Sequence, residues 1–181
     1  MIKRQVFYSF QYIPDNWRVS QVRNIGQIED NKPVSDNKWE EVKKGGDKAI
    51  KKWIDDNLNY RSCTIVLVGE NTANRKWIDY EISKSWDDRK GIVGIHIHKL
   101  KNTNKKQSKK GNNPFEHITF GENKTKLSSI VKCYDPPIAS FSFHPHNKLI
   151  NPFKQTKKLH ITNPIPIGIA SDSMFCSVLF T

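Results

Sequence analysis

Residues 62–90 constrain the fold more than any other stretch of this sequence. They open with six residues, Cys63–Val68, that are apolar and mostly β-branched. Such a run is typical of a strand buried on both faces of a parallel sheet. A polar turn follows, in which Asn71 or Thr72 could cap a helix. The apolar spacing beyond it predicts a helix over about 73–88, ended by a left-handed terminator at Gly91.

Glu81 is the unusual member of this predicted helix. It lies one turn after Trp77 and next to Ile82, on a face that is otherwise apolar or aromatic. A carboxylate in such a place is costly unless it has a partner or a role. The residues alone leave two hypotheses open with equal weight, a satisfied buried carboxylate and a functional one.

Strand-like and helix-like segments alternate along most of the chain. Strands are predicted over 4–10 and 91–98, with at least one more in 115–120 or 127–134, and a weak edge strand in 27–34. Helices are predicted over 17–25 and 47–57, with a short helical turn in 35–42. This order predicts a doubly wound α/β domain, with a mostly parallel sheet of about five strands and helices on both faces.

The last part of the chain has a different character. Six of the nine prolines lie in residues 136–181, without a helical or strand period until the final few residues. We therefore divide the chain into a domain, 1–137, and an irregular Pro-rich tail, 138–181. A doubly wound sheet needs both faces covered, and this tail offers no closing amphipathic helix. The pattern predicts marginal stability unless the tail or a second subunit covers that face.

The net charge of +12 is concentrated in one segment. Residues 99–132 hold nine Lys and two acidic residues, a net of +7, and most of these lysines fall in 99–110. Because no aromatic residue lies among the lysines of 99–110, a stacking surface for nucleic acid is not indicated. A solvated loop is the favoured interpretation, and an arm that contacts phosphate is the alternative.

The remaining motifs indicate neither a metal nor a membrane protein. His96 and His98 share one strand face, and His144 and His146 repeat the spacing, but no Cys or acidic cluster accompanies them. There is no phosphate-binding glycine loop and no nucleophile elbow. Three cysteines without paired spacing, no apolar run of about 18 residues and no signal peptide favour a cytoplasmic protein.

Several strings resemble those of a known family. The segments VFYSF (6–10), TIVLV (64–68) and KWIDYEI (76–82) are similar to the first strand, core strand and third helix of TIR domains. FYSF, NWRVSQVRNIG, KKGGDKAIKKWID, WIDYEI and YDPP together resemble the TIR-like ThsB proteins of bacterial Thoeris antiphage systems. The likeness covers about residues 3–137. It implies a flavodoxin-like TIR fold.

The resemblance also implies a function and a site. Glu81 corresponds by position to the family's catalytic glutamate. The implied substrate-binding residues lie at the carboxyl ends of the strands and one turn before Glu81: Phe7, Tyr8, Ser9, Phe10, Tyr12 and Trp77. The family's chemistry implies cleavage of the nicotinamide–ribose bond of NAD, which is the substrate, without a metal or other cofactor.

The resemblance further implies a signal and a receiver. The product would be a cyclic ADP-ribose-type messenger, made on phage infection by an unknown trigger, and it would activate a separate NAD-consuming effector. Self-association of the TIR domain is a further expectation. A TIR-type scaffold without catalysis is the alternative function, and a phosphate-binding regulator that uses the lysine loop is a weaker one.

Overall fold

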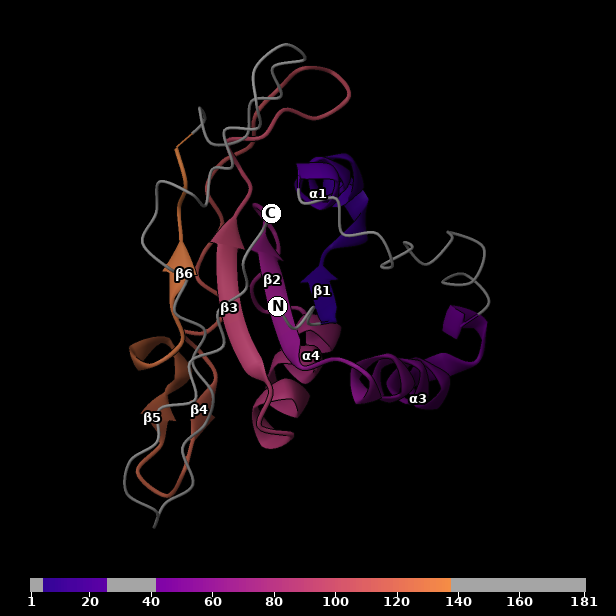
Figure 1. Ribbon diagram of the computed structural model, residues 1–181, viewed down its shortest axis with the longest axis vertical. Coiled ribbons are helices and arrows are strands. Elements are labelled where there is room, and N and C mark those ends of the chain that lie inside the picture. The colour runs from indigo at the N-terminus through magenta and orange to yellow at the C-terminus, as the bar shows by residue number, and fades with distance from the viewer. Residues whose placement is uncertain (1–4, 26–41, 138–181) are drawn as a thin grey trace.

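The computed structural model describes residues 5–25 and 42–137, which form an α/β unit around a parallel sheet (Figure 1). In chain order the elements are β1 (Val6–Phe10), α1 (Tyr12–Ile25), α3 (Gly46–Asn59), β2 (Cys63–Val68), α4 (Lys76–Asp87), β3 (Gly91–His96), β4 (Thr119–Phe120), β5 (Thr125–Lys126), the 3-10 helix η1 (Leu127–Ser129) and β6 (Cys133–Tyr134). The predicted α/β class is confirmed. The predictions for 27–34 and for the tail 138–181 lie outside the described residues.

The main sheet of the described residues has four parallel strands in the order β1-β2-β3-β6. Val6 pairs with Cys63, Cys63 with Gly91, and Gly94 with Cys133. The sequence offered 115–120 and 127–134 as possible further strands. Only 127–134 contributes to this sheet, through β6. The segment 115–120 ends in β4, which pairs antiparallel with β5 in a separate hairpin.

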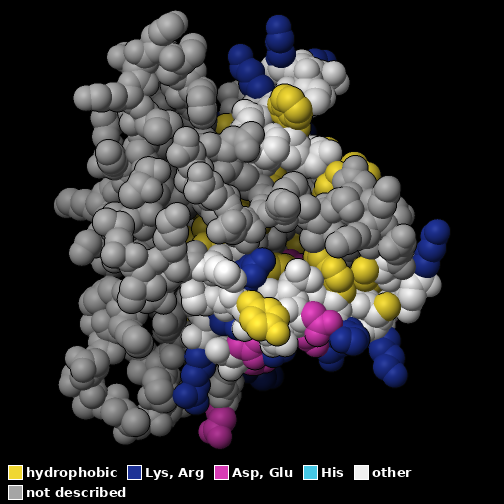
Figure 2. Space-filling view, turned by 45° about the vertical axis from the view of Figure 1, so that its right-hand side comes forward, with side chains coloured by type: hydrophobic (Ala, Val, Ile, Leu, Met, Phe, Trp, Pro, Cys, Tyr) yellow, Lys and Arg dark blue, Asp and Glu magenta, His cyan; other side chains and the backbone are white. Residues whose placement is uncertain are grey.

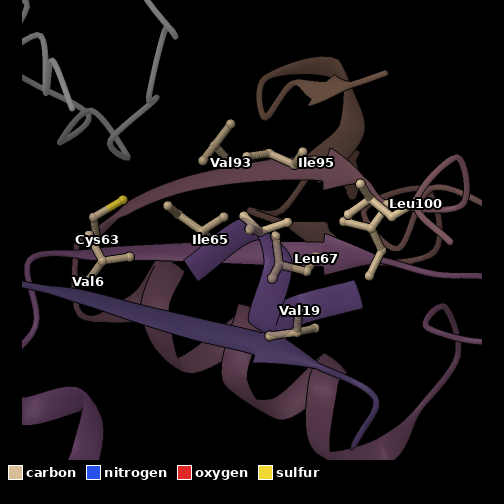
Figure 3. Close-up of a cluster of buried hydrophobic side chains, with 10 residues drawn as sticks. Val6, Val19, Cys63, Ile65, Leu67, Val93, Ile95 and Leu100 are labelled. Atoms are coloured by element: carbon tan, nitrogen blue, oxygen red, sulfur yellow. The ribbon is translucent and has the colours of Figure 1, made fainter. Parts of the chain in front are cut away.

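The two faces of the sheet are covered by different helices, as a doubly wound fold requires. Alternate residues of β2, Cys63, Ile65 and Leu67, pack with Val19 and Val22 of α1 in a buried cluster (Figure 3). Val66 and Val68 point the other way and pack with Ile78 and Ile82 of α4. All six residues of β2 are buried. Burying each such Leu, Ile or Val contributes about 1.5–3 kcal/mol, so β2 is the centre of the core.

The ends of α4 differ in detail from the prediction. The helix begins at Lys76 rather than near 73, and Thr72 does not cap it. The Thr72 hydroxyl instead accepts a hydrogen bond from the Gly69 amide at 2.9 Å, which closes the turn directly after β2. The left-handed residue after the helix is Arg89, with φ of 57°, whereas Gly91 is already the first residue of β3. The capping assignments from sequence were therefore wrong, although the helix itself was predicted.

A buried ion pair within α1 contacts the loop after β3. Arg18 and Asp15 are 2% and 1% exposed, and their side chains meet at 2.9 Å. Arg18 Nε also donates to the Leu100 carbonyl at 2.9 Å. Gly69 completes the contact, because a Cβ there would lie 1.9 Å from Asp15 Oδ2. The start of α1, the end of β2 and the loop after β3 are thus packed together.

The lysine-rich segment 99–110 is a loop whose backbone is tied to the domain. Arg18 and Gln21 of α1 donate to its carbonyls, and the Asn102 side chain accepts from two of its amides. At its two ends, Lys99 and Lys110 pair with Asp135 at 2.7 and 2.8 Å. The heads of the remaining lysines are exposed, as expected of a solvated loop: Lys101, Lys105, Lys106 and Lys109. Within the described ranges, no helix is long and apolar enough to cross a membrane.

Candidate active site

Glu81 lies on the face of α4 that packs against the sheet. It is 9% exposed, and its helix buries Ile78, Ile82 and Ser85 on the same face. Its side chain reaches β1, where the Ser9 hydroxyl donates to Glu81 Oε2 at 2.5 Å. Ser9 is 1% exposed and lies 72 residues earlier in the chain. The two residues are therefore brought together by tertiary packing alone.

The carboxyl of Glu81 is electrostatically isolated. Burial raises its pKa from the ordinary value of 4.5 to about 8, and the hydrogen bond from Ser9 opposes this only in part. Among the described residues, no Lys, Arg or His forms an ion pair with it. Ionising this carboxyl without a cationic partner is costly, and the raised pKa reflects that cost. The structure thus gives the environment of this carboxyl: buried, with one hydroxyl donor.

A second set of hydroxyls holds the backbone at Glu81. The Ser85 hydroxyl donates to the Glu81 carbonyl at 2.6 Å, and it also contacts the Thr64 hydroxyl of β2 at 2.7 Å. Both hydroxyl residues are 0% exposed. This part of α4 is thereby tied to β2 through Ser85 and to β1 through Glu81. Sequence reasoning missed this link, because a Ser on an apolar helix face carries no signal of its partner.

Phe7 and Trp77 lie on the Glu81 side of the sheet. Phe7 is buried with Ile50, Ile54 and Leu58 of α3, and Trp77 packs against the same cluster. The Trp77 ring meets the Tyr80 ring edge-on at 6.2 Å. These contacts place two aromatic side chains on the side of the sheet that α4 covers.

Tyr8 and Phe10 lie on the other face of the sheet. Both pack against the cluster under α1, because alternate side chains of a strand point to opposite faces. Tyr12 follows at the start of α1, with its ring 6.4 Å from that of Phe10. Of the six residues proposed from the resemblance to bind substrate, Ser9 contacts Glu81, and Phe7 and Trp77 lie on the same side of the sheet. Tyr8, Phe10 and Tyr12 lie away from Glu81.

A groove between α3 and α4 adjoins the aromatic side of this site. Its volume is about 540 Å³, and Figure 2, which turns the α3 side forward, shows hydrophobic, basic and acidic side chains mixed on this surface. The lining residues are Asp47, Lys48, Lys51, Lys76, Trp77, Asp79, Tyr80 and Ser83. Lys76 lies 4.8 Å from the centre of the Trp77 ring, and Lys51 5.2 Å from that of Tyr80. Glu81 itself does not line the groove.

The histidine at the end of β3 and the one two residues beyond it are not in contact with Glu81. His96 and His98 lie with their rings 5.8 Å apart, next to the ion pairs of Asp135 with Lys99 and Lys110. Burial, helped by Lys110, lowers the pKa of His96 to about 4, so this ring is neutral at physiological pH. Within residues 5–25 and 42–137, no three His, Cys or acidic side chains are grouped as metal ligands. His144 and His146 lie outside those residues.

Comparison with known proteins gives two consistent matches. The family model described as "Thoeris protein ThsB, TIR-like domain" matches residues 7–102, a range that contains Ser9, Trp77 and Glu81. A curated relative from Bacillus cereus (strain MSX-D12), named "Putative cyclic ADP-D-ribose synthase ThsB1", is 38% identical over 122 residues. The match covers 65% of this chain and 64% of the relative.

Proposed function

The chain belongs to the ThsB family of Thoeris proteins with a TIR-like domain, and on that premise we propose that it is an enzyme that breaks the nicotinamide–ribose bond of NAD. Its product is a cyclic ADP-ribose-type signal, which a separate NAD-consuming effector receives in antiphage defence. The name of the Bacillus cereus relative supports this kind of product. Glu81 is the catalytic residue in this proposal.

The chemistry needs one carboxylate and little else. When the bond between ribose C1′ and the pyridinium nitrogen breaks, its electron pair goes to the nitrogen, so nicotinamide leaves neutral and needs no general acid. The ribose develops positive, oxocarbenium-like charge, which a carboxylate beside it stabilises. Attack by water gives ADP-ribose. Attack by a hydroxyl or an adenine nitrogen of the same molecule gives a cyclic isomer, and in either case the nucleophile releases a proton.

One observation carries the proposal. Glu81 is buried without an ion pair to any described residue, so its pKa is raised to about 8 and it is largely uncharged at neutral pH. A cationic pyridinium ring placed beside it favours the ionised form, since an opposite charge within a few ångströms lowers the pKa of a carboxyl. The site is therefore suited to a ligand that brings its own positive charge.

The experiment is Glu81→Gln, which keeps the shape of the side chain and removes its ability to ionise. Mass spectrometry of the NAD products should show turnover lower by at least about a hundredfold, the scale of losing a key electrostatic contact. The matched control is Asp87→Asn, which removes an acid from the end of the same helix and should leave turnover unchanged. Near-normal turnover in a folded Glu81→Gln protein would end the enzyme proposal.

A non-catalytic TIR scaffold is the second candidate, favoured by exposed apolar surface on α1. Ile13 and Trp17 are 74% and 51% exposed there, which suits binding to another domain. A scaffold needs no ionised Glu81, so Glu81→Gln would leave its defence phenotype intact. Loss of the phenotype in Glu81→Gln together with retention in Trp17→Ser would decide for the enzyme.

A further inference from the structure

Ser9 makes the only hydrogen bond that a described residue gives to the carboxyl of Glu81. The hydroxyl lies 2.5 Å from Oε2, and both side chains are buried. The other carboxyl oxygen, Oε1, accepts no hydrogen bond from a described residue. A hydrogen bond to one oxygen restricts the orientation of the carboxyl group. The second oxygen can then contact a ligand.

The burial of Ser9 also limits what else it can do. Its single O–H is used by Glu81, and the side chain is 1% exposed, packed under α4. A residue that contacts substrate needs accessible surface, which the Ser9 side chain lacks. Ser9 is better placed to act on Glu81 than on NAD, although the family resemblance implied a substrate-binding role.

We propose that Ser9 is a positioning residue, whose hydroxyl holds Glu81 with one carboxyl oxygen turned toward the ribose of the substrate. This inference rests on the proposed function of Glu81 as the catalytic carboxylate. Ser85 and Thr64 complement it at the backbone, because they fix the Glu81 carbonyl and hence the turn of α4 that carries the side chain.

The arrangement predicts an electrostatic effect of Ser9 as well as a geometric one. A donor to a carboxylate favours the ionised form, so the hydroxyl lowers the pKa of Glu81, against the larger effect of burial. Two ionisable residues of α4 have partners other than Glu81. Tyr80 of α4 donates to Asp55 of α3, and Lys76 pairs with Asp47. On the facing segments of β1 and β2, Ser9 and Thr64 are neutral hydroxyls.

The test compares Ser9→Ala with Ser9→Thr by two measurements. The first is a pH titration of the Glu81 carboxyl by carbon-13 NMR with labelled glutamate, assigned with Glu81→Gln. Ser9→Ala should move the midpoint to higher pH, and Ser9→Thr, which keeps the hydroxyl, should restore it. Ser129→Ala is the control, because its hydroxyl donates to the Lys126 carbonyl and not to α4 or β1, so the Glu81 midpoint should stay.

The second measurement is NAD turnover as a function of pH. Ser9→Ala should lower kcat by about 10- to 100-fold with little change in KM, the pattern of a misplaced catalytic group rather than a lost substrate contact. The limb of kcat/KM that rises through the Glu81 pKa should move to higher pH in the same variant. Ser9→Thr should restore most of kcat.

The outcomes separate this inference from the proposed function. An unchanged carboxyl midpoint in Ser9→Ala would overturn the role of Ser9, and so would a raised KM with an unchanged kcat. If no form of the protein turns over NAD, the proposed function fails, and the titration still tells whether Ser9 controls Glu81. Should Ser9→Ala not fold, Ser9→Cys provides the same test, because a thiol is a much weaker donor.

Discussion

Glu81 should make the protein less stable as pH rises, and replacing it by Gln should remove that loss. The folded protein keeps the carboxyl protonated up to pH of about 8, whereas the unfolded chain releases the proton near 4.5. Between these values the folded state binds more protons than the unfolded state, so the free energy of unfolding falls as pH rises. At about 1.4 kcal/mol per pH unit, the whole window is worth up to about 5 kcal/mol.

The assay is urea unfolding of the wild type and Glu81→Gln at intervals from pH 4.5 to 8. Between pH 4.5 and pH 7.5, the free energy of unfolding of Glu81→Gln should rise by about 4 kcal/mol relative to that of the wild type. Asp15, with its raised pKa, and Asp135, with its lowered pKa, contribute to both curves and cancel in the difference. A difference that is constant with pH would refute the reasoning, since it would show that the Glu81 carboxyl titrates alike in both states.

Two further predictions concern α1 and the lysine loop. Arg18→Ala should lower the free energy of unfolding by about 3–5 kcal/mol in urea melts, because it leaves the buried Asp15 carboxylate without its partner, and Asp15→Asn in the same chain should recover part of the loss. Changing three exposed loop lysines to Ser should leave the Tm and NAD turnover almost unchanged: Lys105, Lys106 and Lys109. Any nucleic-acid binding that the three lysines support should be lost with added salt, and tight, salt-resistant binding would contradict the solvated-loop interpretation.

Local pattern determined the framework of the protein. The run Cys63–Val68 has the composition of a strand buried on both faces, and it is the centre of the sheet. The spacing of Trp77, Ile78 and Ile82 is enough to place Glu81 on the inner face of its helix. Both features depend on residues that are close together in the sequence. Apolar residues recur there at the period of a strand or of a helix, and such periods can be recognised in the sequence.

Only the tertiary structure decided what Glu81 meets there. Ser9 is 72 residues away, and its contact depends on the register between β1 and β2 and on the packing of α4 over both. The same register turns Phe7 and Ser9 toward Glu81 but Tyr8 and Phe10 toward α1, which a resemblance between strings did not separate. The pKa of Glu81 depends on how completely water is excluded, and that exclusion is a property of the assembled layers rather than of any segment.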